Sequence, residues 1–262
     1  MSSLVVVGGG RMGEALVGGL LAAGWAPPDL AIVETVDERR SQLAERFPGV
    51  TVVAGSYGAD GAVVAVKPPD VPAATSAAVG AGAQRILSIA AGVTIAALEQ
   101  AAGDGVAVVR AMPNTPALVG EGASAIAGGT AAVEDDLTWA ESILGAVGSV
   151  VRVPEASLDA VTGLSGSGPA YVFLVAEALM DAGVLAGLPR PTAEALVRQT
   201  ILGSARLLAE SGDGPEVLRA AVTSPGGTTA AGLRELERHG LRAAILDAVT
   251  AATARSKELG SS

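Results

Sequence analysis

Short apolar runs alternate with amphipathic stretches along the first half of the chain. The runs are rich in valine and isoleucine and mostly unalternating, as expected for strands that are buried on both faces of a parallel sheet. The predicted strands are Leu4–Val7, Leu30–Val33, Val50–Val53, Ala62–Val66, Arg85–Ile89, Val106–Arg110 and Ser149–Val153. The predicted helices between them are Glu14–Ala23, Asp37–Arg46, Thr94–Ala101 and Val133–Val147. This order predicts a doubly wound, mostly parallel α/β sheet.

Beyond Pro154 the pattern changes to long helical stretches without strand alternation. The predicted helices are Pro169–Ala186, Thr192–Glu210, Pro215–Ala221, Gly227–Arg238 and Leu241–Glu258. We therefore expect an α/β domain over residues 1–153 and an all-helical domain over residues 154–262. Alanine and glycine line many of these helix faces, and aromatic residues that could fill a core are scarce. We expect the helices to bury their apolar faces against a second copy of the chain.

Composition narrows the classes of function. The chain has 262 residues, no cysteine, one histidine and a formal net charge of −10. The negative charge argues against nucleic acid and anionic membranes as partners, and no apolar run is long enough for a membrane span. Without cysteine there is no thiolate or disulfide, the lone His239 suits a surface helix end, and we expect no metal site. The first residues lack the basic region of a secretory signal, so the expected location is the cytoplasm.

A glycine-rich turn, Gly8-Gly9-Gly10-Arg11-Met12-Gly13, joins the first predicted strand to a helix. In this pattern the first glycine allows a tight turn, the second admits a pyrophosphate, and the third permits close helix–strand packing. Glu34 follows the second strand, where an acid can accept a hydrogen bond from the ribose 2′-hydroxyl of NAD. Arg39 and Arg40 could instead reach the 2′-phosphate of NADP, or lie in a solvated helical turn. The pattern predicts a Rossmann-type dinucleotide site and leaves the choice between NAD and NADP open.

Three further segments lie at the carboxyl ends of predicted strands, where open α/β sheets bind ligands. Val66-Lys67-Pro68 closes the fourth strand, and Lys67 is a candidate general acid or, more simply, a ribose contact. Ala90-Ala91-Gly92 follows the fifth strand and suits a tight floor under a nicotinamide ring. Asn114 lies in the loop after the sixth strand, in which two prolines fix the backbone, so a rigid structural turn is the alternative there.

A turn rich in hydroxyl groups and glycine, Thr223-Ser224-Pro225-Gly226-Gly227-Thr228-Thr229, precedes a helical pattern that starts at Ala230. Pro225 stops a preceding helix, and the glycines let the backbone approach a ligand. The helix start offers free N–H groups and the positive end of its dipole, which suits a small carboxylate. A capped helix start without any ligand is the alternative explanation.

Together these segments resemble the pyrroline-5-carboxylate reductase family over nearly the whole chain. The matching positions are Val66-Lys67-Pro68, Ala90-Ala91-Gly92, Met112–Pro116, Thr162–Tyr171, Pro215, Leu218, Val222, Thr223-Ser224, Gly226-Gly227, Thr229, Gly232-Leu233 and Leu236-Glu237. The resemblance implies an oxidoreductase that reduces 1-pyrroline-5-carboxylate to L-proline with NAD(P)H, the last step of proline biosynthesis. Members of the family use NADPH more often than NADH. Their helical domains pair into dimers, which commonly join into a decamer.

The resemblance also implies roles for single residues. The substrate carboxylate would accept hydrogen bonds from Ser224, Thr229 and the backbone N–H groups of Gly227 and Thr228. The Thr229 hydroxyl would also orient the ring nitrogen or a water near it, which makes it the candidate catalytic group. Glu155 matches an acid that lies near the substrate ring in relatives. Because a protonated imine is already electrophilic, positioning it against a nicotinamide suffices, and neither a strong acid nor a metal is needed.

Three other classes of protein fit less well. The β-hydroxyacid dehydrogenases share this two-domain plan but need a lysine one helical turn beyond a Gly-x-Gly, where this chain has Val172. A Gly-x-Ser-x-Gly hydrolase elbow fails because Ser167 stands where its second glycine should be and no strand leads into it. A non-enzymatic dinucleotide sensor has no need of a second site for a small acid, such as the turn at Thr223–Thr229.

Overall fold

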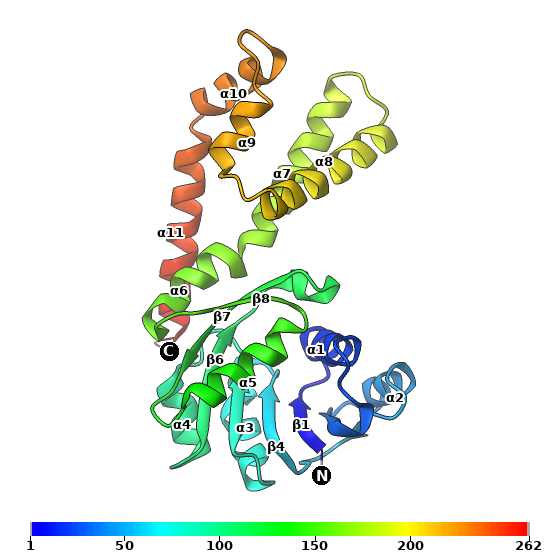
Figure 1. Cartoon of the computed structure of the whole chain (residues 1–262), viewed down its shortest axis with the longest axis vertical. Coiled ribbons are helices and arrows are strands. Elements are labelled where there is room, and N and C mark those ends of the chain that lie inside the picture. Colours follow the sequence, from blue (N-terminus) through cyan, green and yellow to red (C-terminus); the bar gives the residue numbers. More distant parts are fainter. Residues whose placement is uncertain (1, 261–262) are drawn as a thin grey trace. The chain divides into compact units, whose positions relative to one another are not determined.

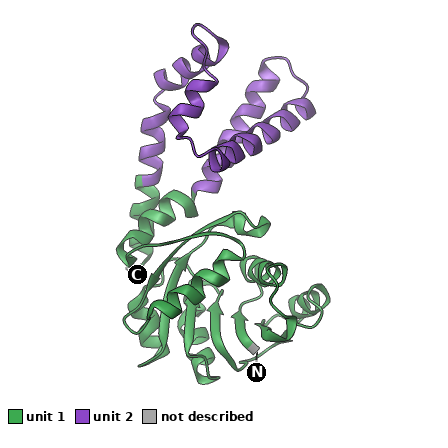
Figure 2. Cartoon of the chain, viewed as in Figure 1, with its two compact units in different colours: residues 1–167, 250–262 green, residues 168–249 purple. Residues whose placement is uncertain are grey.

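The computed structural model describes residues 2–260, and the chain forms two compact units (Figures 1 and 2). The first unit comprises Met1–Ser167 together with Thr250–Ser262, and the second comprises Gly168–Val249. The chain therefore crosses between the units twice, once after Ser167 and once inside its last helix. The end of that helix belongs to the unit that contains the sheet.

One eight-stranded sheet forms the centre of the first unit, with the strand order β3-β2-β1-β4-β5-β6-β7-β8. The strands are β1 Ser2–Val7, β2 Leu30–Val33, β3 Thr51–Val53, β4 Ala59–Val64, β5 Arg85–Ser88, β6 Ala107–Met112, β7 Gly122–Gly128 and β8 Gly148–Arg152. Neighbouring strands are parallel except β6 and β7, which are antiparallel. The predicted doubly wound, mostly parallel sheet is confirmed. Its strand order reverses between β1 and β4, and open α/β sheets bind ligands at such a point.

Helices cover both faces of the sheet (Figure 1). They are α1 Arg11–Ala22, α2 Asp37–Arg46, α3 Val71–Gly80, α4 Ile95–Ala102, α5 Glu134–Gly145 and the short α6 Leu158–Val161. Most buried apolar residues of the sheet lie in two clusters, one with α1, α2 and α5 and the other with α3 and α4. A third, smaller cluster joins Ala125 and Ala127 of β7 to Leu158 of α6. Leu4 and Val6 of β1 face the first cluster, whereas Val5 faces the second. Burial on both faces explains why the strands read as unbroken apolar runs.

One strand and two helices of this unit were not predicted from the sequence, the second helix being the four-residue α6. The strand β7 has the sequence Gly-Ala-Ser-Ala-Ile-Ala-Gly, and such small residues have little strand propensity. The helix α3 has Pro72 in its first turn and small residues over most of its length, so it shows little amphipathic contrast. The strand β4 also ends two residues earlier than predicted, which leaves Val66 in the following loop.

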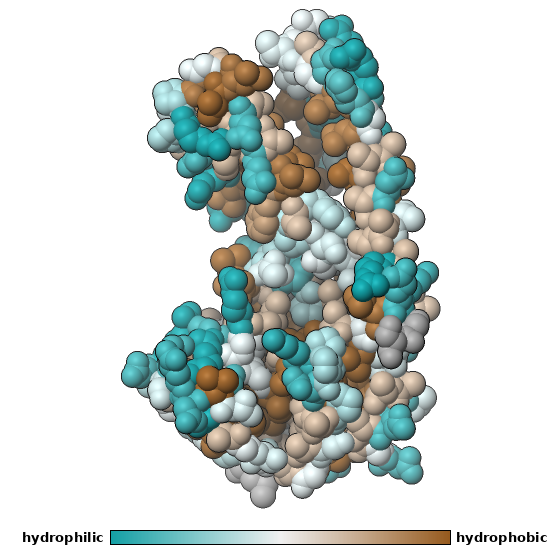
Figure 3. Space-filling model, turned by 180° about the vertical axis from the view of Figure 1, so that it is seen from behind, coloured by the Kyte–Doolittle hydropathy of each residue, from teal (hydrophilic) through white to brown (hydrophobic). Residues whose placement is uncertain are grey.

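The second unit is entirely helical, as the sequence predicted. Its helices are α7 Gly168–Leu185, α8 Arg190–Glu210, α9 Pro215–Ala221, α10 Thr228–Arg238 and the first part of α11 Leu241–Gly260. Many large apolar side chains on these helices are exposed, among them Leu174 at 66%, Leu185 at 90% and Leu246 at 68%. Figure 3 shows hydrophobic residues gathered on the surface of this unit. No uninterrupted apolar run was expected to span a membrane, but the mean hydropathy of the helical stretch Glu155–Leu185 makes it long and apolar enough to do so by length and composition alone, which for a single helix is weak evidence of a span.

Candidate functional site

The glycine-rich turn lies between β1 and α1, at the point where the strand order reverses. Gly8 has a φ of 109°, and a Cβ atom there would stand 2.7 Å from the Ala65 carbonyl oxygen. A Cβ atom on Gly13 would overlap the Gly8 carbonyl oxygen. Around Gly10, in contrast, a Cβ atom would meet nothing within 4 Å. Gly8 and Gly13 thus allow the turn to pack closely, and Gly10 leaves its outer side open.

The amino end of α1 faces that open side without a side chain to cap it. Gly10 is the N-cap residue and makes no side-chain hydrogen bond to the helix. The first N–H groups of a helix have no partner inside the helix, and together with its dipole they attract an anion. Backbone N–H groups from Arg11 to Gly13 can therefore bind a pyrophosphate. The residues of this turn fit a dinucleotide.

A network of hydrogen bonds joins the glycine-rich turn to the end of β2. The Glu34 carboxylate accepts hydrogen bonds from the backbone N–H of Gly9, at 3.0 Å, and of Val36, at 2.9 Å. Arg39 donates from Nε to the Gly9 carbonyl oxygen at 2.8 Å and pairs through Nη2 with Glu14. Glu14 is not among the predicted site residues, although its place in the first turn of α1 is a usable signal. The structure thus brings Glu34 and Arg39 together beside the turn.

The loops after β4, β5 and β6 lie at the same edge of the sheet, as their strands are parallel. Lys67 is exposed, and Pro68 begins a short 3-10 turn behind it. Ala90 is buried and Ala91 is exposed, just before Gly92 with its φ of 76°. The loop after β5 therefore makes the tight turn that a flat ring could rest on.

Asn114 ties the loop after β6 to two other elements. Its side-chain Nδ2 donates to the Ser165 carbonyl oxygen at 3.1 Å, and its Oδ1 accepts from the backbone N–H of Ala123 at 2.8 Å. Ser165 lies in a π-helical turn, Thr162–Gly166, and single π-turns are frequent at functional sites. The amide of Asn114 thus fixes the position of that turn against β7.

Glu155 belongs to a second cluster in this unit. Its Oε1 accepts from the backbone N–H of Ile95, at the amino end of α4, at 2.7 Å. The same oxygen pairs with Arg110 at 2.9 Å, and the Arg110 side chain is only 9% exposed. Arg110 is not among the predicted site residues, although an arginine inside an otherwise apolar strand was a signal for it. Glu155 therefore compensates a buried charge, a structural task that the resemblance did not imply.

The hydroxyl-rich turn lies on the second unit, before α10. The Gly227 N–H donates to the Ser224 carbonyl oxygen at 3.0 Å, and Gly226 has a φ of 69°, as expected for a turn with proline and glycine at its centre. The N-cap of α10 is Gly227, and no side chain caps this helix. Among the described residues, no hydrogen-bond partner is found for the hydroxyl groups of Ser224 and Thr229. Two hydroxyl groups and the first N–H groups of α10 are therefore available to a ligand. The predicted contact from the Gly227 N–H is not, because that group already donates to Ser224 across the turn.

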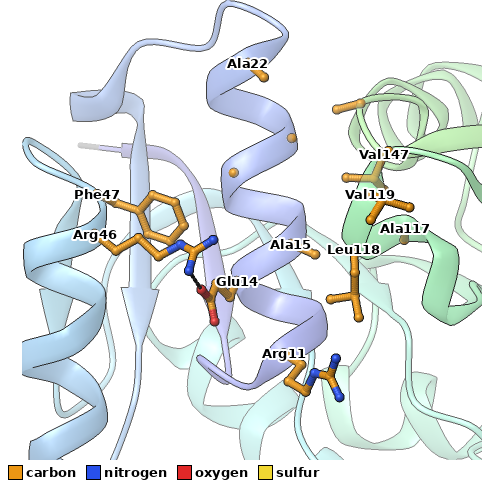
Figure 4. Close-up of a pocket in the computed structure, with 14 residues that line it drawn as sticks. Arg11, Glu14, Ala15, Ala22, Arg46, Phe47, Ala117, Leu118, Val119 and Val147 are labelled. Atoms are coloured by element: carbon orange, nitrogen blue, oxygen red, sulfur yellow. Dashed lines mark ion pairs between the residues drawn. The ribbon is translucent and has the colours of Figure 1, made fainter. Parts of the chain in front are cut away.

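Two cavities lie near the dinucleotide turn. A groove of about 470 Å³ runs along α1 beside the turn Thr115–Val119 (Figure 4), and Arg11 is the predicted site residue that lines it. In this groove Glu14 and Arg46 point toward each other and form an ion pair of 2.7 Å. A smaller cavity of about 190 Å³ is lined by Val7 and Val33, at the carboxyl ends of β1 and β2. The smaller cavity is an apolar recess at these strand ends, and none of the predicted site residues lines it.

Comparison with known proteins gives consistent matches along the chain. The family model described as pyrroline-5-carboxylate reductase dimerisation matches residues 155–259. A model described as NADP oxidoreductase, coenzyme F420-dependent, matches residues 3–92. The pyrroline-5-carboxylate reductase of Corynebacterium melassecola is 44% identical, over 99% of each chain. That of Mycobacterium tuberculosis is 45% identical, over 99% of this chain and 97% of its own.

Solved structures extend the similarity to three dimensions. The pyrroline-5-carboxylate reductase from Coxiella burnetii has a TM-score of 0.93 at 38% identity and covers 98% of both chains. The Plasmodium falciparum pyrroline carboxylate reductase, with NADP bound, has a TM-score of 0.85 at 31% identity. It covers 99% of this chain and 98% of its own. The similarity therefore includes both the sheet and the helical domain.

Proposed function

This chain belongs to the pyrroline-5-carboxylate reductase family, and from that premise we propose how its residues carry out the reaction. The enzyme reduces 1-pyrroline-5-carboxylate to L-proline in proline biosynthesis, with a nicotinamide dinucleotide as hydride donor. The observation that carries this conclusion is identity of 44–46% with curated members over 98–99% of the chain.

The glycine-rich turn is the proposed dinucleotide site. When bound, the dinucleotide supplies the hydride that the imine carbon accepts. Gly10 leaves room for the pyrophosphate, and the N–H groups at the start of α1 hold it. Ala90 and Ala91 form the floor for the nicotinamide ring, and Val66, Lys67 and Pro68 line the ribose beside it. Asn114 contributes by fixing the loop after β6, and Met12 packs beneath the turn.

The hydroxyl-rich turn is the proposed substrate clamp, which we define as Ser224, Gly227, Thr228 and Thr229. Its two unpartnered hydroxyl groups and the N–H group of Thr228 hold the carboxylate at a helix amino end, whereas the Gly227 N–H stays bonded to the Ser224 carbonyl oxygen. Thr229, half-buried in the first turn of α10, also orients the ring nitrogen, which carries a proton in the reactive imine. Glu155 stays a predicted neighbour of the ring, with its carboxylate already held by Arg110.

The activity is tested by the oxidation of NADPH and of NADH in the presence of 1-pyrroline-5-carboxylate. We expect both dinucleotides to be oxidised only when the substrate is present, and proline to accumulate in equal amount. The family resemblance favours NADPH, and either dinucleotide is a possible donor. Substrate-dependent oxidation of neither would contradict the proposed function.

We also propose that the chain acts as a homo-oligomer built from dimers, in the cytoplasm. A dimerisation model matches residues 155–259, and large apolar side chains such as Leu185 and Leu246 are exposed in the isolated chain. A partner copy of the helical unit would bury them, and members of the family commonly join such dimers into a decamer. Light scattering at micromolar concentration should give at least twice the chain mass of 25.6 kDa. A stable monomer would contradict this proposal.

A further inference from the structure

Glu34 lies at the carboxyl end of β2, and in the described part of the chain its carboxylate accepts hydrogen bonds from backbone N–H groups only. Each of its carboxylate oxygens accepts one backbone N–H, from Gly9 and from Val36. A carboxylate has about four acceptor positions, so the group can take further donors. Among the described residues, no arginine or lysine forms an ion pair with it. Glu34 therefore has spare acceptor positions beside the dinucleotide turn.

Arg39 and Arg40 lie close to Glu34 in the sequence, but their guanidinium groups bind partners other than its carboxylate. Arg39 uses Nε on the Gly9 carbonyl oxygen, Nη1 on Gln42 at 3.2 Å and Nη2 on Glu14. Arg40 donates from Nη1 to the carbonyl oxygens of Glu34 and Thr35, at 3.0 and 2.8 Å, and pairs through Nη2 with Asp37. Each guanidinium group would have to leave a carboxylate and a carbonyl oxygen before it could bind a phosphate.

In a sheet of this type, the group at the end of the second strand meets the adenosine ribose. A 2′-hydroxyl there can donate to a carboxylate, whereas a 2′-phosphate would bring at least one more negative charge against it. We propose that Glu34 makes NADH the preferred donor of this enzyme, against the usual preference of the family. This proposal rests on the proposed function only in that it assumes the same dinucleotide site.

A structural role for Glu34 alone makes a different prediction. Its hydrogen bond to Gly9 braces the glycine-rich turn, and a Cβ atom on Gly9 would come within 3.0 Å of its Oε2. Loss of this hydrogen bond would weaken the binding of both dinucleotides equally, because both contain the pyrophosphate that the turn binds. Selectivity against the phosphate changes the ratio of the two affinities instead. The ratio therefore separates the two roles.

The test is a calorimetric titration of the full chain with NADH and with NADPH, without substrate. The variants are Glu34→Gln, which keeps the shape and removes the charge, and the matched control Glu38→Gln on α2, whose carboxylate is exposed. We expect the wild type to bind NADH about tenfold more tightly than NADPH, and Glu34→Gln to lower that ratio about tenfold by tightening NADPH. Glu38→Gln should leave the ratio within about twofold, because the Glu38 side chain is exposed and salt screens its charge.

Two outcomes would overturn the proposal. The first is that the wild type binds NADPH more tightly than NADH. The second is that Glu34→Gln loses affinity for both dinucleotides by the same factor. A Glu34→Gln chain that does not fold leaves the wild-type ratio as a decisive measurement. The values of kcat/KM for the two donors should follow the same ratio. A protein that binds NADH selectively but does not reduce 1-pyrroline-5-carboxylate would contradict the proposed function and leave the role of Glu34 intact.

Discussion

Gly10→Val is expected to weaken the binding of NADH and of NADPH about a hundredfold, because each hydrogen bond to a charged acceptor is worth about 1.5–3 kcal/mol. The valine side chain would stand on the open side of the turn, between the pyrophosphate and the N–H groups of α1. The fold should tolerate it. Gly10 has a φ of −66°, which any residue adopts, and a Cβ atom there meets nothing within 4 Å. Calorimetric titration gives the affinity, and thermal unfolding gives the stability.

The matched control for this variant is Gly145→Val. Gly145 is also exposed, and a Cβ atom there would also meet nothing within 4 Å, but it lies at the end of α5, away from the turn. The control should bind both dinucleotides as the wild type does. Equal affinity of Gly10→Val and the wild type would refute the assignment of this turn. Gly13→Val is the opposite case, because its Cβ atom would overlap the Gly8 carbonyl oxygen, so loss of stability is expected.

The elements that the sequence predicted well carry strong local signals. Asp37–Arg46 and Pro215–Ala221 agree with α2 and α9 at both ends, since acidic residues and proline favour the first helical turn. The buried run Leu30–Val33 likewise agrees with β2. The strand β7 was not predicted, because its own small residues do not favour a strand. It forms a strand through its pairing with β6 and β8. Its antiparallel pairing with β6 depends on contacts that no local pattern records.

The candidate site shows the same division between local and distant information. The glycine spacing, with a strand before it, a helix after it and Glu34 after the next strand, predicted the glycine-rich turn, because the geometry of the turn is set within six residues. It could not predict how charges pair across the fold. Arg39 was expected to face a phosphate or solvent, yet it binds Gly9 and Glu14, 30 and 25 residues away. Glu155 and Arg110 are 45 residues apart, and their pairing follows only once β6 and the segment after β8 are placed.

Thr229→Ala is expected to lower kcat/KM for 1-pyrroline-5-carboxylate by about one to two orders of magnitude, the value of one hydrogen bond to a charged acceptor. Part of this loss should appear in kcat, since the same hydroxyl orients the ring nitrogen. The affinity for NADH and NADPH should barely change, because the proposed dinucleotide site lies on the other unit. Steady-state kinetics over substrate concentration, together with calorimetric titration of the dinucleotides, measure these quantities.

The structure makes this test sharper than the sequence allowed. A capping threonine would lose about 1 kcal/mol of stability on replacement by alanine and keep normal kinetics. However, the N-cap of α10 is Gly227, and no side chain caps the helix, so Thr229→Ala should leave the unfolding midpoint nearly unchanged. Thr229→Ser keeps the hydroxyl and should restore most of the activity. Thr228→Ala keeps the neighbouring N–H and should remain active. A Thr229→Ala enzyme that is destabilised but kinetically intact would remove Thr229 from the substrate clamp and return it to a purely structural role.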